Sequence, residues 1–315
     1  MNNKILIVDH MHESIIEMLG DSGFRPDYQP EIKRAEILNI IDQYAGIIVR
    51  SKTRIDKELI SRATNLQFVA RAGAGIDNVD YQVISNRNIK LVNAPEGNRD
   101  ALGEHAVGML LTLLHKIHLA NQEVKQGVWD REGNRGWELK GKTVGIYGFG
   151  YMGSAFAKKL RGFDCTVFVY DKYKTGLSNE FIQQVDLQTF QKETEILSLH
   201  IPLTSETKFL FDEFYLSQFP KLRILLNTAR GEILSLKALD KLLSTSKLIG
   251  VGLDVLENEK INQLNMEEQA IFDKLAKREN VIMTPHVAGW TFESYKRINE
   301  ILVSKLQKEG LAHVR

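Results

Sequence analysis

A glycine-rich run at 148–153 has the residue types and spacing that can hold a diphosphate. It is Gly148, Phe149, Gly150, Tyr151, Met152 and Gly153, between the strand-like residues 143–147 and the helix-like residues 154–160. In such a loop the first glycine permits a tight turn, the second lets the backbone approach a pyrophosphate, and the third allows helix and strand to pack closely. Free N–H groups at the helix start favour the phosphates. The run therefore predicts a dinucleotide-binding loop, with a plain tight turn as the alternative.

Asp171 lies eighteen residues after Gly153, at the end of the next strand-like run. An acidic side chain at that place can accept hydrogen bonds from the ribose hydroxyls and repels a 2′-phosphate. We therefore expect NAD rather than NADP as the cofactor. Lys172 and Lys174 lie close to Asp171 along the chain and weaken this argument.

The elements that must position these residues alternate between short β-branched runs and amphipathic segments of helical length. The expected strands are 4–8, 46–50, 66–71, 89–92, 143–148, 166–170, 195–200, 223–227, 249–255 and 280–284. The main expected helices are 11–22, 31–43, 56–64, 152–161, 235–245 and 291–309. This alternation predicts an α/β protein with doubly wound parallel sheets. Ten strands are many for one open sheet, so we expect two domains.

A long helical pattern without proline covers residues 100–126. Its apolar residues recur at a spacing close to that of one helix face. Such a helix could cross between domains or form part of a subunit interface, and an ordinary buried helix explains the pattern equally well. Residues 127–141 are polar and glycine-rich, which predicts an exposed loop.

Composition excludes several functional classes. The chain has 315 residues, a formal net charge of +1, 43% hydrophobic and 26% charged residues, and one cysteine, Cys165. The sequence has no concentrated run of basic residues of the kind that binds nucleic acid. No apolar run reaches the length of a membrane span. One cysteine cannot form an internal disulfide, which fits a reducing compartment. The strand-like start shows no signal-peptide pattern, so we expect a cytoplasmic protein. The sequence indicates no metal ligands.

Several further motifs occur in a fixed order along nearly the whole chain. They are Arg71–Asp80, Asn93–Asn98, Gly103–Val107, the glycine-rich run, His200–Pro202, Asn227–Gly231, Gly252–Val255 and Thr284–His286. Together they closely resemble the D-isomer-specific 2-hydroxyacid dehydrogenases, a family that includes phosphoglycerate dehydrogenase and hydroxypyruvate reductase. The resemblance implies a Rossmann-like NAD-binding domain at 99–287, inserted into a discontinuous substrate domain made of 1–98 and 288–315. It also implies a homodimer formed through the cofactor domain.

The resemblance assigns three catalytic residues. Arg230 would hold the carboxylate and carbonyl of the substrate, for which a planar donor fork is suited. His286 would be the general acid and base, and Glu259 would hydrogen-bond its imidazole and fix the tautomer. Glu259 is followed by Lys260, where the family usually has proline, and Glu257 is a nearby competitor for the role.

Other positions match the family's cofactor and substrate contacts. On the cofactor side, Asp254 would bind the nicotinamide carboxamide, and His200, Pro202, Thr228 and Ala229 would line the cleft mostly through backbone. On the substrate side, the matching residues are Arg50, Ser51, Gly73, Ala74, Asn98 and Arg230. Arg99 and Asp100 depart from the small polar residues usual after Asn98. Trp290 stands where many relatives have a small residue, and it would either narrow the pocket or simply pack.

The implied activity is hydride transfer between NAD(H) and a small 2-hydroxy or 2-keto acid, most closely that of a D-3-phosphoglycerate dehydrogenase of serine biosynthesis. Positive charge for a phosphate could come from Arg50, Lys52, Arg54, Arg71 and Arg99, or these could be solvated surface charges. The first alternative is a reductase of glyoxylate, hydroxypyruvate or 2-keto acids in general. An alternative of another class is an NAD-sensing scaffold like the corepressor branch of the family.

Overall fold

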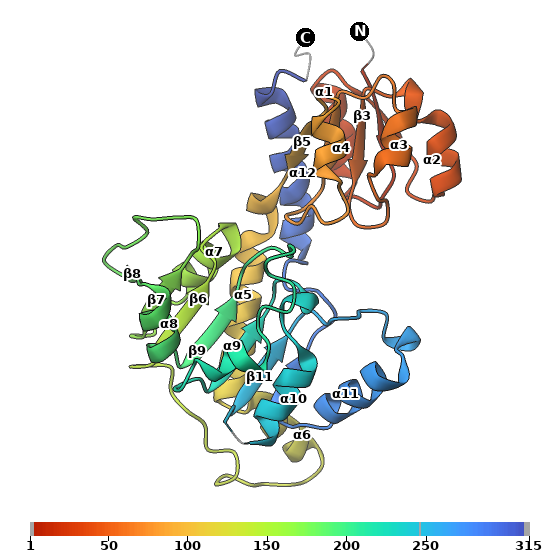
Figure 1. Ribbon diagram of the computed structural model, residues 1–315. Helices are drawn as coiled ribbons and strands as arrows, with labels where there is room; N and C mark the ends of the chain where they lie inside the picture. Colours follow the sequence, from red (N-terminus) through yellow and green to blue (C-terminus); the bar gives the residue numbers. More distant parts are fainter. Residues whose placement is uncertain (1–2, 246, 312–315) are drawn as a thin grey trace. The chain divides into compact units, whose positions relative to one another are not determined.

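The computed structural model describes residues 3–245 and 247–311. The chain divides into two compact units (Figure 1). The first is formed by Met1–Arg99 together with Trp290–Arg315, and the second by Asp100–Gly289. The first unit therefore contains residues from both ends of the chain, and the second is one continuous segment between them.

The first unit is built on a five-stranded parallel sheet with the order β2-β1-β3-β4-β5. Its strands are β1 (Lys4–Ile7), β2 (Arg25–Tyr28), β3 (Gly46–Val49), β4 (Phe68–Arg71) and β5 (Lys90–Asn93). Its helices are α1 (Ser14–Asp21), α2 (Arg34–Ile40), α3 (Lys57–Arg62), α4 (Tyr81–Ser85) and α12 (Phe292–Lys308). Successive side chains of a strand point to opposite faces, so an apolar strand such as β1 needs cover on both sides.

Both faces of this sheet are covered by helices. Ile5 and Ile7 pack with residues of α1 and α12, whereas Leu6 packs on the other face with residues of α2, α3 and α4. Helix α12 lies beside α1 and β5 in Figure 1 and contacts both. The last helix thus completes a layer that begins with the first one.

The second unit is built on a seven-stranded parallel sheet with the order β12-β11-β10-β9-β6-β7-β8. Its strands are β6 (Thr143–Tyr147), β7 (Thr166–Tyr170), β8 (Ile182–Gln184), β9 (Ile196–Leu199), β10 (Ile224–Asn227), β11 (Gly250–Leu253) and β12 (Val281–Met283). The helices that lie wholly in this unit are α6 (Ile117–Lys125), α7 (Tyr151–Lys159), α8 (Leu187–Glu193), α9 (Glu213–Ser217), α10 (Leu236–Ser244) and α11 (Met266–Ala276). Two parallel α/β sheets confirm the predicted fold class.

Helix α5 (Pro95–Leu114) has residues in both units, since 95–99 belong to the first and 100–114 to the second. Alternate strand residues again face opposite cores in the second unit. Ile196 packs on the side of α5 and α7, whereas Leu197 and Leu199 pack on the side of α8, α9 and α10. Buried on both faces, these strands are near-continuous apolar runs, which explains why they could be predicted from the sequence.

The structure corrects two expectations about the elements. The helical pattern at 100–126 is not continuous, because Lys116 has a φ of 52° and separates α5 from α6. No residue of helix α6 is classed as buried, and Ile117 is exposed. The apolar spacing therefore continues past Lys116 although the buried face ends with α5, and this spacing could not show the break. The expected strands also omit β2 and β8. Both lie at sheet edges, where Pro26 is tolerated and a polar strand such as Ile182–Gln184 suffices.

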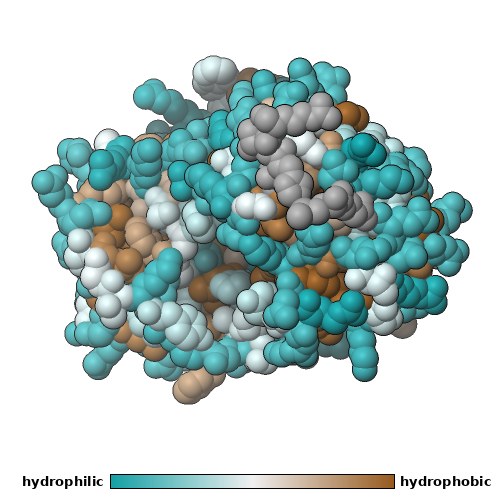
Figure 2. All heavy atoms as spheres, turned by 90° about the horizontal axis from the view of Figure 1, so that it is seen from above, coloured by the Kyte–Doolittle hydropathy of each residue, from teal (hydrophilic) through white to brown (hydrophobic). Residues whose placement is uncertain are grey.

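Hydrophilic side chains predominate on the face drawn in Figure 2, and the hydrophobic patches between them are small and separate. In the part of the chain that the structure describes, no helix combines the length and the apolar character needed to cross a membrane. Residues 127–141 contain no helix or strand and form the expected loop.

Candidate active site

The predicted cofactor and catalytic residues of the second unit follow the carboxyl ends of parallel strands. The glycine-rich loop follows β6, Asp171 follows β7, His200 follows β9, Thr228–Arg230 follow β10, Asp254 follows β11 and His286 follows β12. Strand β6 lies between β9 and β7, so the sheet order reverses beside it. In open α/β sheets a ligand binds outside the carboxyl ends at such a switch point.

The glycine-rich loop has the shape that a dinucleotide requires. Gly148 has a φ of +92°, and a Cβ there would lie 2.6 Å from Ile201 and 2.7 Å from the carbonyl oxygen of His200. A Cβ on Gly153 would lie 2.2 Å from the carbonyl oxygen of Gly148, so helix α7 can pack this closely only with glycine. Around Gly150, the N-cap of α7, a Cβ would meet nothing within 4 Å. The open space lies where a pyrophosphate would meet the helix start, so these residues fit the group.

Asp171 is held at the mouth of this loop by backbone donors. The N–H of Phe149 donates to one carboxylate oxygen at 2.8 Å, and those of Tyr173 and Lys174 donate to the other at 3.0 and 3.1 Å. Burial alone would raise the pKa of Asp171, but these hydrogen bonds outweigh it and leave the pKa below its ordinary value. The carboxylate is therefore charged at neutral pH, and it stands beside the phosphate loop where a ribose would lie.

Two buried polar atoms near this edge have no hydrogen-bond partner among the described residues. They are Nδ1 of His200 and Oγ1 of Thr228. The other ring nitrogen of His200 lies 2.8 Å from the hydroxyl of Ser198, and burial lowers the pKa of His200 to about 3, so the ring is neutral. Buried polar atoms are rarely left unpaired in proteins, which fits the binding of a polar ligand here. Pro202, in the same loop, accepts a hydrogen bond through its carbonyl oxygen from Thr207.

Asn227 organises the loop that carries Arg230. Its side chain is fully buried, accepts from the N–H of Ala229 at 3.0 Å and donates to the carbonyl oxygen of Arg230 at 3.0 Å. A Cβ on Gly231 would lie 1.9 Å from the carbonyl oxygen of Leu256, so only glycine lets this loop lie against the segment after β11. The guanidinium of Arg230 donates to the carbonyl oxygen of Ala229 at 2.6 Å. The sequence motif contained Asn227, but its positioning role was missed.

His286 and Glu259 form a pair. Nδ1 of His286 lies 3.0 Å from one carboxylate oxygen of Glu259 and 3.1 Å from the other, and both side chains are about half exposed. Glu257, the competing acid, instead accepts a hydrogen bond from the N–H of Leu236 at 2.5 Å, and burial raises the pKa of Glu257. The geometry therefore favours Glu259 as the partner of the imidazole. Such a pair can hold a tautomer and exchange a proton at the other ring nitrogen.

Asp254 fixes the turn that carries His286. Its carboxylate is 1% exposed and accepts hydrogen bonds from the Thr284 hydroxyl at 2.5 Å and from the N–H groups of Val287 and Ala288 at 2.9 and 2.8 Å. Its carbonyl oxygen accepts from the N–H of His286 at 2.8 Å. His286 has a φ of 55°, a left-handed conformation that costs free energy and persists where neighbours impose it, often at functional sites. Asp254 thus positions His286, whatever it contributes to a cofactor.

His105, on helix α5, adds a contact that the sequence argument did not assign. Its Nε2 lies 3.2 Å from the hydroxyl of Thr284 and 3.8 Å from the Asp254 carboxylate. The only signal in the sequence was its place in the Gly103–Val107 motif. The hydrogen bonds from His105 to Thr284 and from Thr284 to Asp254 therefore connect helix α5 to the turn that carries His286.

Apart from Arg230, which belongs to the second unit, the predicted substrate residues lie in the first unit, again after the carboxyl ends of neighbouring strands. Arg50 and Ser51 follow β3, Gly73 and Ala74 follow β4, and Asn98 lies in the first turns of α5, just after β5. Gly73 is buried with a φ of +136°, and the side-chain oxygen of Asn98 is buried without a hydrogen-bond partner among the described residues. The structure therefore gathers these residues at one edge of their own sheet.

The guanidinium of Arg50 lies over two aromatic side chains of the same unit. Its guanidinium carbon lies 4.1 Å from the ring centre of Trp290 and 5.4 Å from that of Tyr295, and burial lowers the pKa of Arg50. The N–H of Arg50 donates to Asp9 at 2.7 Å. Trp290 thus packs on the arginine, a cation–π contact that fixes the direction of the guanidinium.

Within residues 3–245 and 247–311, no three His, Cys, Asp or Glu side chains are grouped so that they could hold a metal ion. The side chains described above that could do chemistry are the imidazole of His286, the carboxylate of Glu259 and the guanidinium of Arg230.

Comparison with known proteins shows the family to which the chain belongs. Residues 107–288 match the model of the D-isomer specific 2-hydroxyacid dehydrogenase, NAD binding domain. Among curated proteins, the chain is 32% identical over 308 residues to D-3-phosphoglycerate dehydrogenase of Archaeoglobus fulgidus, covering 96% of this chain and 56% of that relative. It is 34% identical to hydroxypyruvate reductase of Thermotoga maritima, covering 97% of this chain and 98% of the relative.

Among solved structures, D-lactate dehydrogenase from Aquifex aeolicus, complexed with NAD and lactic acid, matches with a TM-score of 0.82 and 25% identity. The match covers 98% of this chain and 96% of the other. The chain spans little more than half the length of the phosphoglycerate dehydrogenase it resembles. The family model and the relatives together place the sequence without ambiguity: this chain belongs to the D-isomer-specific 2-hydroxyacid dehydrogenase family and contains that family's NAD-binding domain.

Proposed function

We propose that the protein is an NAD-dependent oxidoreductase that interconverts a small D-2-hydroxy acid and the corresponding 2-keto acid. The observation that carries this proposal is the Glu259–His286 pair, 3.0 Å apart, on the same sheet edge as the phosphate loop and Arg230. When bound, the nicotinamide supplies or accepts the hydride. The residues of the chain bind, orient and exchange the proton.

In this proposal each catalytic residue has a separate task. Arg230 binds the carboxylate and the oxygen of the reacting carbon, because its planar fork can donate to both. His286, held at Nδ1 by Glu259, donates a proton from Nε2 to the oxygen during reduction and accepts it there during oxidation. Asn227 and Asp254 position these side chains through the hydrogen bonds already described.

Cofactor contacts are proposed for the loop Gly148, Phe149, Gly150, Tyr151, Met152 and Gly153, and for Asp171, His200, Pro202, Thr228, Ala229 and Asp254. Substrate contacts are proposed for Arg50, Ser51, Gly73, Ala74, Asn98 and Arg230. In domain terms, 99–287 binds the cofactor, while 1–98 with 288–315 supplies the remaining substrate contacts. The open space at Gly150 and the unpartnered buried atoms of His200 and Thr228 support the cofactor side.

For the substrate, we propose D-3-phosphoglycerate, which places the reaction in serine biosynthesis. Arg50 and its basic neighbours would meet the phosphate. Reduction of glyoxylate or hydroxypyruvate is the second candidate, and one observation favours it. The guanidinium of Arg50 is stacked on Trp290, which leaves less of it open to a phosphate. An unphosphorylated acid needs no such contact.

The test follows NADH absorbance with the purified protein. NAD with D-3-phosphoglycerate is compared with NADH plus hydroxypyruvate, glyoxylate or larger 2-keto acids. Turnover fastest with D-3-phosphoglycerate supports the first candidate, and turnover fastest with an unphosphorylated keto acid supports the second. Tight NADH binding without turnover of any of them would contradict the catalytic proposal and favour an NAD-sensing scaffold.

We also propose that the protein is a homodimer in the cytoplasm. The dimer would form through the cofactor unit, as the family resemblance implies, and light scattering of the purified chain measures its mass. Cys165 is buried and free, and burial raises the pKa of its thiol, so it is a poor candidate for oxidation. The chain has a single cysteine and cannot form an internal disulfide, which suits a reducing compartment.

A further inference from the structure

The two lysines that follow Asp171 are both hydrogen-bonded to acceptors of the chain. Nζ of Lys172 donates to the carboxylate of Glu206 at 2.6 Å, and Nζ of Lys174 donates to the carbonyl oxygen of Phe149 at 2.9 Å. A basic side chain near the ribose is what allows a Rossmann domain to accept the 2′-phosphate of NADP. The position of each ammonium group therefore bears directly on which cofactor is bound.

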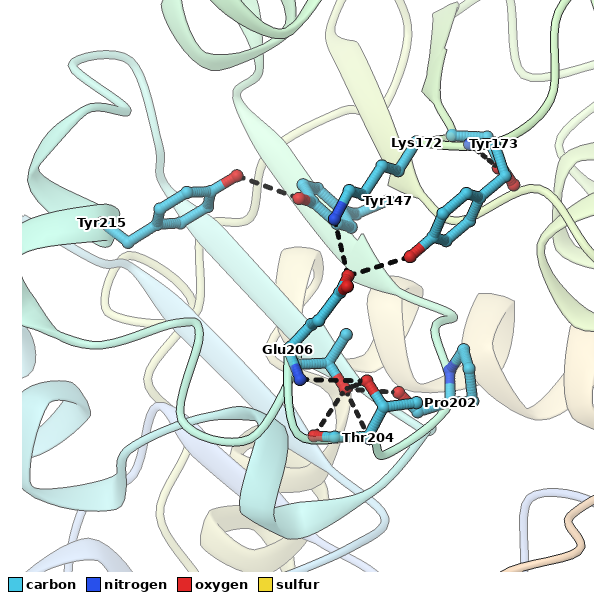
Figure 3. Close-up of polar contacts among 9 residues, drawn as sticks. Tyr147, Lys172, Tyr173, Pro202, Thr204, Glu206 and Tyr215 are labelled. Atoms are coloured by element: carbon cyan, nitrogen blue, oxygen red, sulfur yellow. Dashed lines mark hydrogen bonds and ion pairs between the residues drawn. The ribbon is translucent and has the colours of Figure 1, made fainter. Parts of the chain in front are cut away.

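Glu206 is the acceptor for Lys172, and it is also bound by a second donor. The hydroxyl of Tyr173 donates to the same carboxylate oxygen at 2.9 Å. Figure 3 shows the Glu206 carboxylate between the ends of Lys172 and Tyr173. Lys172 and Tyr173 follow β7, whereas Glu206 lies in the loop after β9. One carboxylate thus joins two loops of the same sheet edge.

The loop that carries Glu206 is closed on itself by two threonines. Oγ1 of Thr207 donates to the carbonyl oxygen of Pro202 at 2.6 Å, and the N–H of Thr204 donates to Oγ1 of Thr207 at 2.8 Å. The N–H of Glu206 donates to the hydroxyl of Thr204 at 3.3 Å. These hydrogen bonds fix the backbone position of Glu206, and its side chain extends from there to Lys172 (Figure 3).

The place of this contact follows from the strand order. Strands β7 and β9 lie on either side of β6, whose carboxyl end carries the phosphate loop. Asp171 and Lys172 are consecutive, so the ion pair stands at the ribose end of the proposed cofactor site. Hydrogen bonds from Lys172 and Tyr173 lower the pKa of Glu206, and the Glu206 carboxylate raises the pKa of Lys172, so both groups are charged at neutral pH.

We propose that Glu206 is a determinant of cofactor specificity: by binding Lys172 and Tyr173 it withholds the lysine cation from a 2′-phosphate and so favours NAD over NADP. This inference rests on the proposed binding of NAD at this site. Asp171 and Glu206 then act on the same choice in different ways. Asp171 accepts from the ribose and repels the phosphate, and Glu206 removes the nearby cation that would otherwise attract it.

The test measures dissociation constants for NADH and NADPH by the fluorescence of the bound dihydronicotinamide, so it needs no substrate. In Glu206→Gln the charge is lost while the shape is kept, and in Glu206→Ala the contact is lost entirely. We expect the Kd for NADPH to fall by about fivefold or more, because a freed ammonium group can bond the phosphate. The Kd for NADH should change little. In the double variant Glu206→Gln/Lys172→Gln the gain should disappear.

Glu193→Gln is the matched control. Glu193 accepts from Lys221 at the same distance of 2.6 Å in an exposed pair outside the proposed cofactor loops, so its loss should leave both constants unchanged. Unchanged NADPH affinity in both Glu206 variants, with NADH still bound by the wild type, would overturn the specificity role and leave the proposed function standing. A gain that persists without Lys172 would overturn the lysine mechanism. A wild-type protein that binds neither nucleotide would overturn this inference together with the proposed function.

Discussion

Nδ1 of His286 lies 3.0 Å from a carboxylate oxygen of Glu259, and the two side chains come from different loops of one sheet edge. A carboxylate only accepts hydrogen bonds, so Nδ1 must carry the proton in this pair. Nε2 is then the ring atom at which a proton can be gained or lost. The backbone of His286 is held in a left-handed conformation by the turn around Asp254, which fixes where that atom points.

Replacing His286 with alanine removes the proposed proton donor and acceptor. We expect kcat to fall by about 10²- to 10⁴-fold, the usual contribution of a general acid or base. NADH affinity should be nearly unchanged, because none of the phosphate loop is altered. His10→Ala is the matched control, since His10 pairs with Glu31 at 2.7 Å in an exposed contact of the first unit. Equal turnover in His286→Ala and wild type would rule out the proposed role.

Glu259→Gln tests which glutamate serves the imidazole. The amide can still accept from Nδ1 but brings no charge to stabilise the imidazolium, so we expect kcat to fall by at least about tenfold. Glu257→Gln is the comparison, because Glu257 bonds the N–H of Leu236 instead. We expect its kcat to stay near the wild-type value. If Glu257→Gln lost activity and Glu259→Gln did not, the assignment would have to be reversed.

Most of the strands could be predicted because parallel strands buried on both faces are uninterrupted apolar runs. The Gly148–Gly153 loop could be predicted because its three glycines each meet a separate steric demand, as the short Cβ distances at Gly148 and Gly153 show. The edge strand Arg25–Tyr28 has no such signature, because water satisfies one side of it and proline is tolerated. The break between α5 and α6 at Lys116 also has no signature in the sequence, since the apolar spacing continues on both sides of it.

For the site, sequence reasoning could name residues but not the contacts between them. Glu257 and Glu259 differ by two positions in the sequence, and only the path of the chain after β11 shows which one reaches His286. Lys172 was an argument against NAD in the sequence. In the structure it is bound to Glu206, which lies 34 residues away along the chain. Long-range pairs of this kind depend on strand order and on side-chain direction, and neither can be obtained from local patterns.

Asp171→Ala tests the proposed ribose contact. The change removes a carboxylate that accepts three backbone hydrogen bonds and would accept from ribose hydroxyls. We expect NADH to bind more weakly and the ratio of the NADPH and NADH dissociation constants to narrow by about tenfold, because loss of one charge also relieves repulsion of the 2′-phosphate. The two constants measured by titration give the ratio directly. An unaltered ratio would contradict this account of cofactor choice.

Asp254→Asn tests how strongly the turn around His286 depends on a buried anion. The asparagine amide has an NH2 donor in place of one carboxylate oxygen, so it would have to place a donor against the N–H group of either Val287 or Ala288. We expect a loss of about 1–3 kcal/mol in the free energy of unfolding, the usual cost of an unmatched buried polar group. Urea unfolding measures it. In the folded variant, kcat should fall more than KM rises, since His286 is displaced from its position. Wild-type stability and wild-type kcat together would show that the turn does not depend on this charge.

His200 predicts how stability depends on pH. Burial lowers its pKa from an ordinary value of 6.5 to about 3, so between these pH values the unfolded chain binds a proton that the folded chain does not. The free energy of unfolding must then decrease as the pH falls below 6.5, by about 1.4 kcal/mol per pH unit from this residue. His200→Gln cannot bind that proton, so urea unfolding at pH 7.5 and pH 5.5 should show a smaller loss in the variant than in the wild type. The difference between the two losses isolates His200 from the other histidines. Equal losses would mean that His200 is protonated in the folded protein, contrary to its burial beside Ser198.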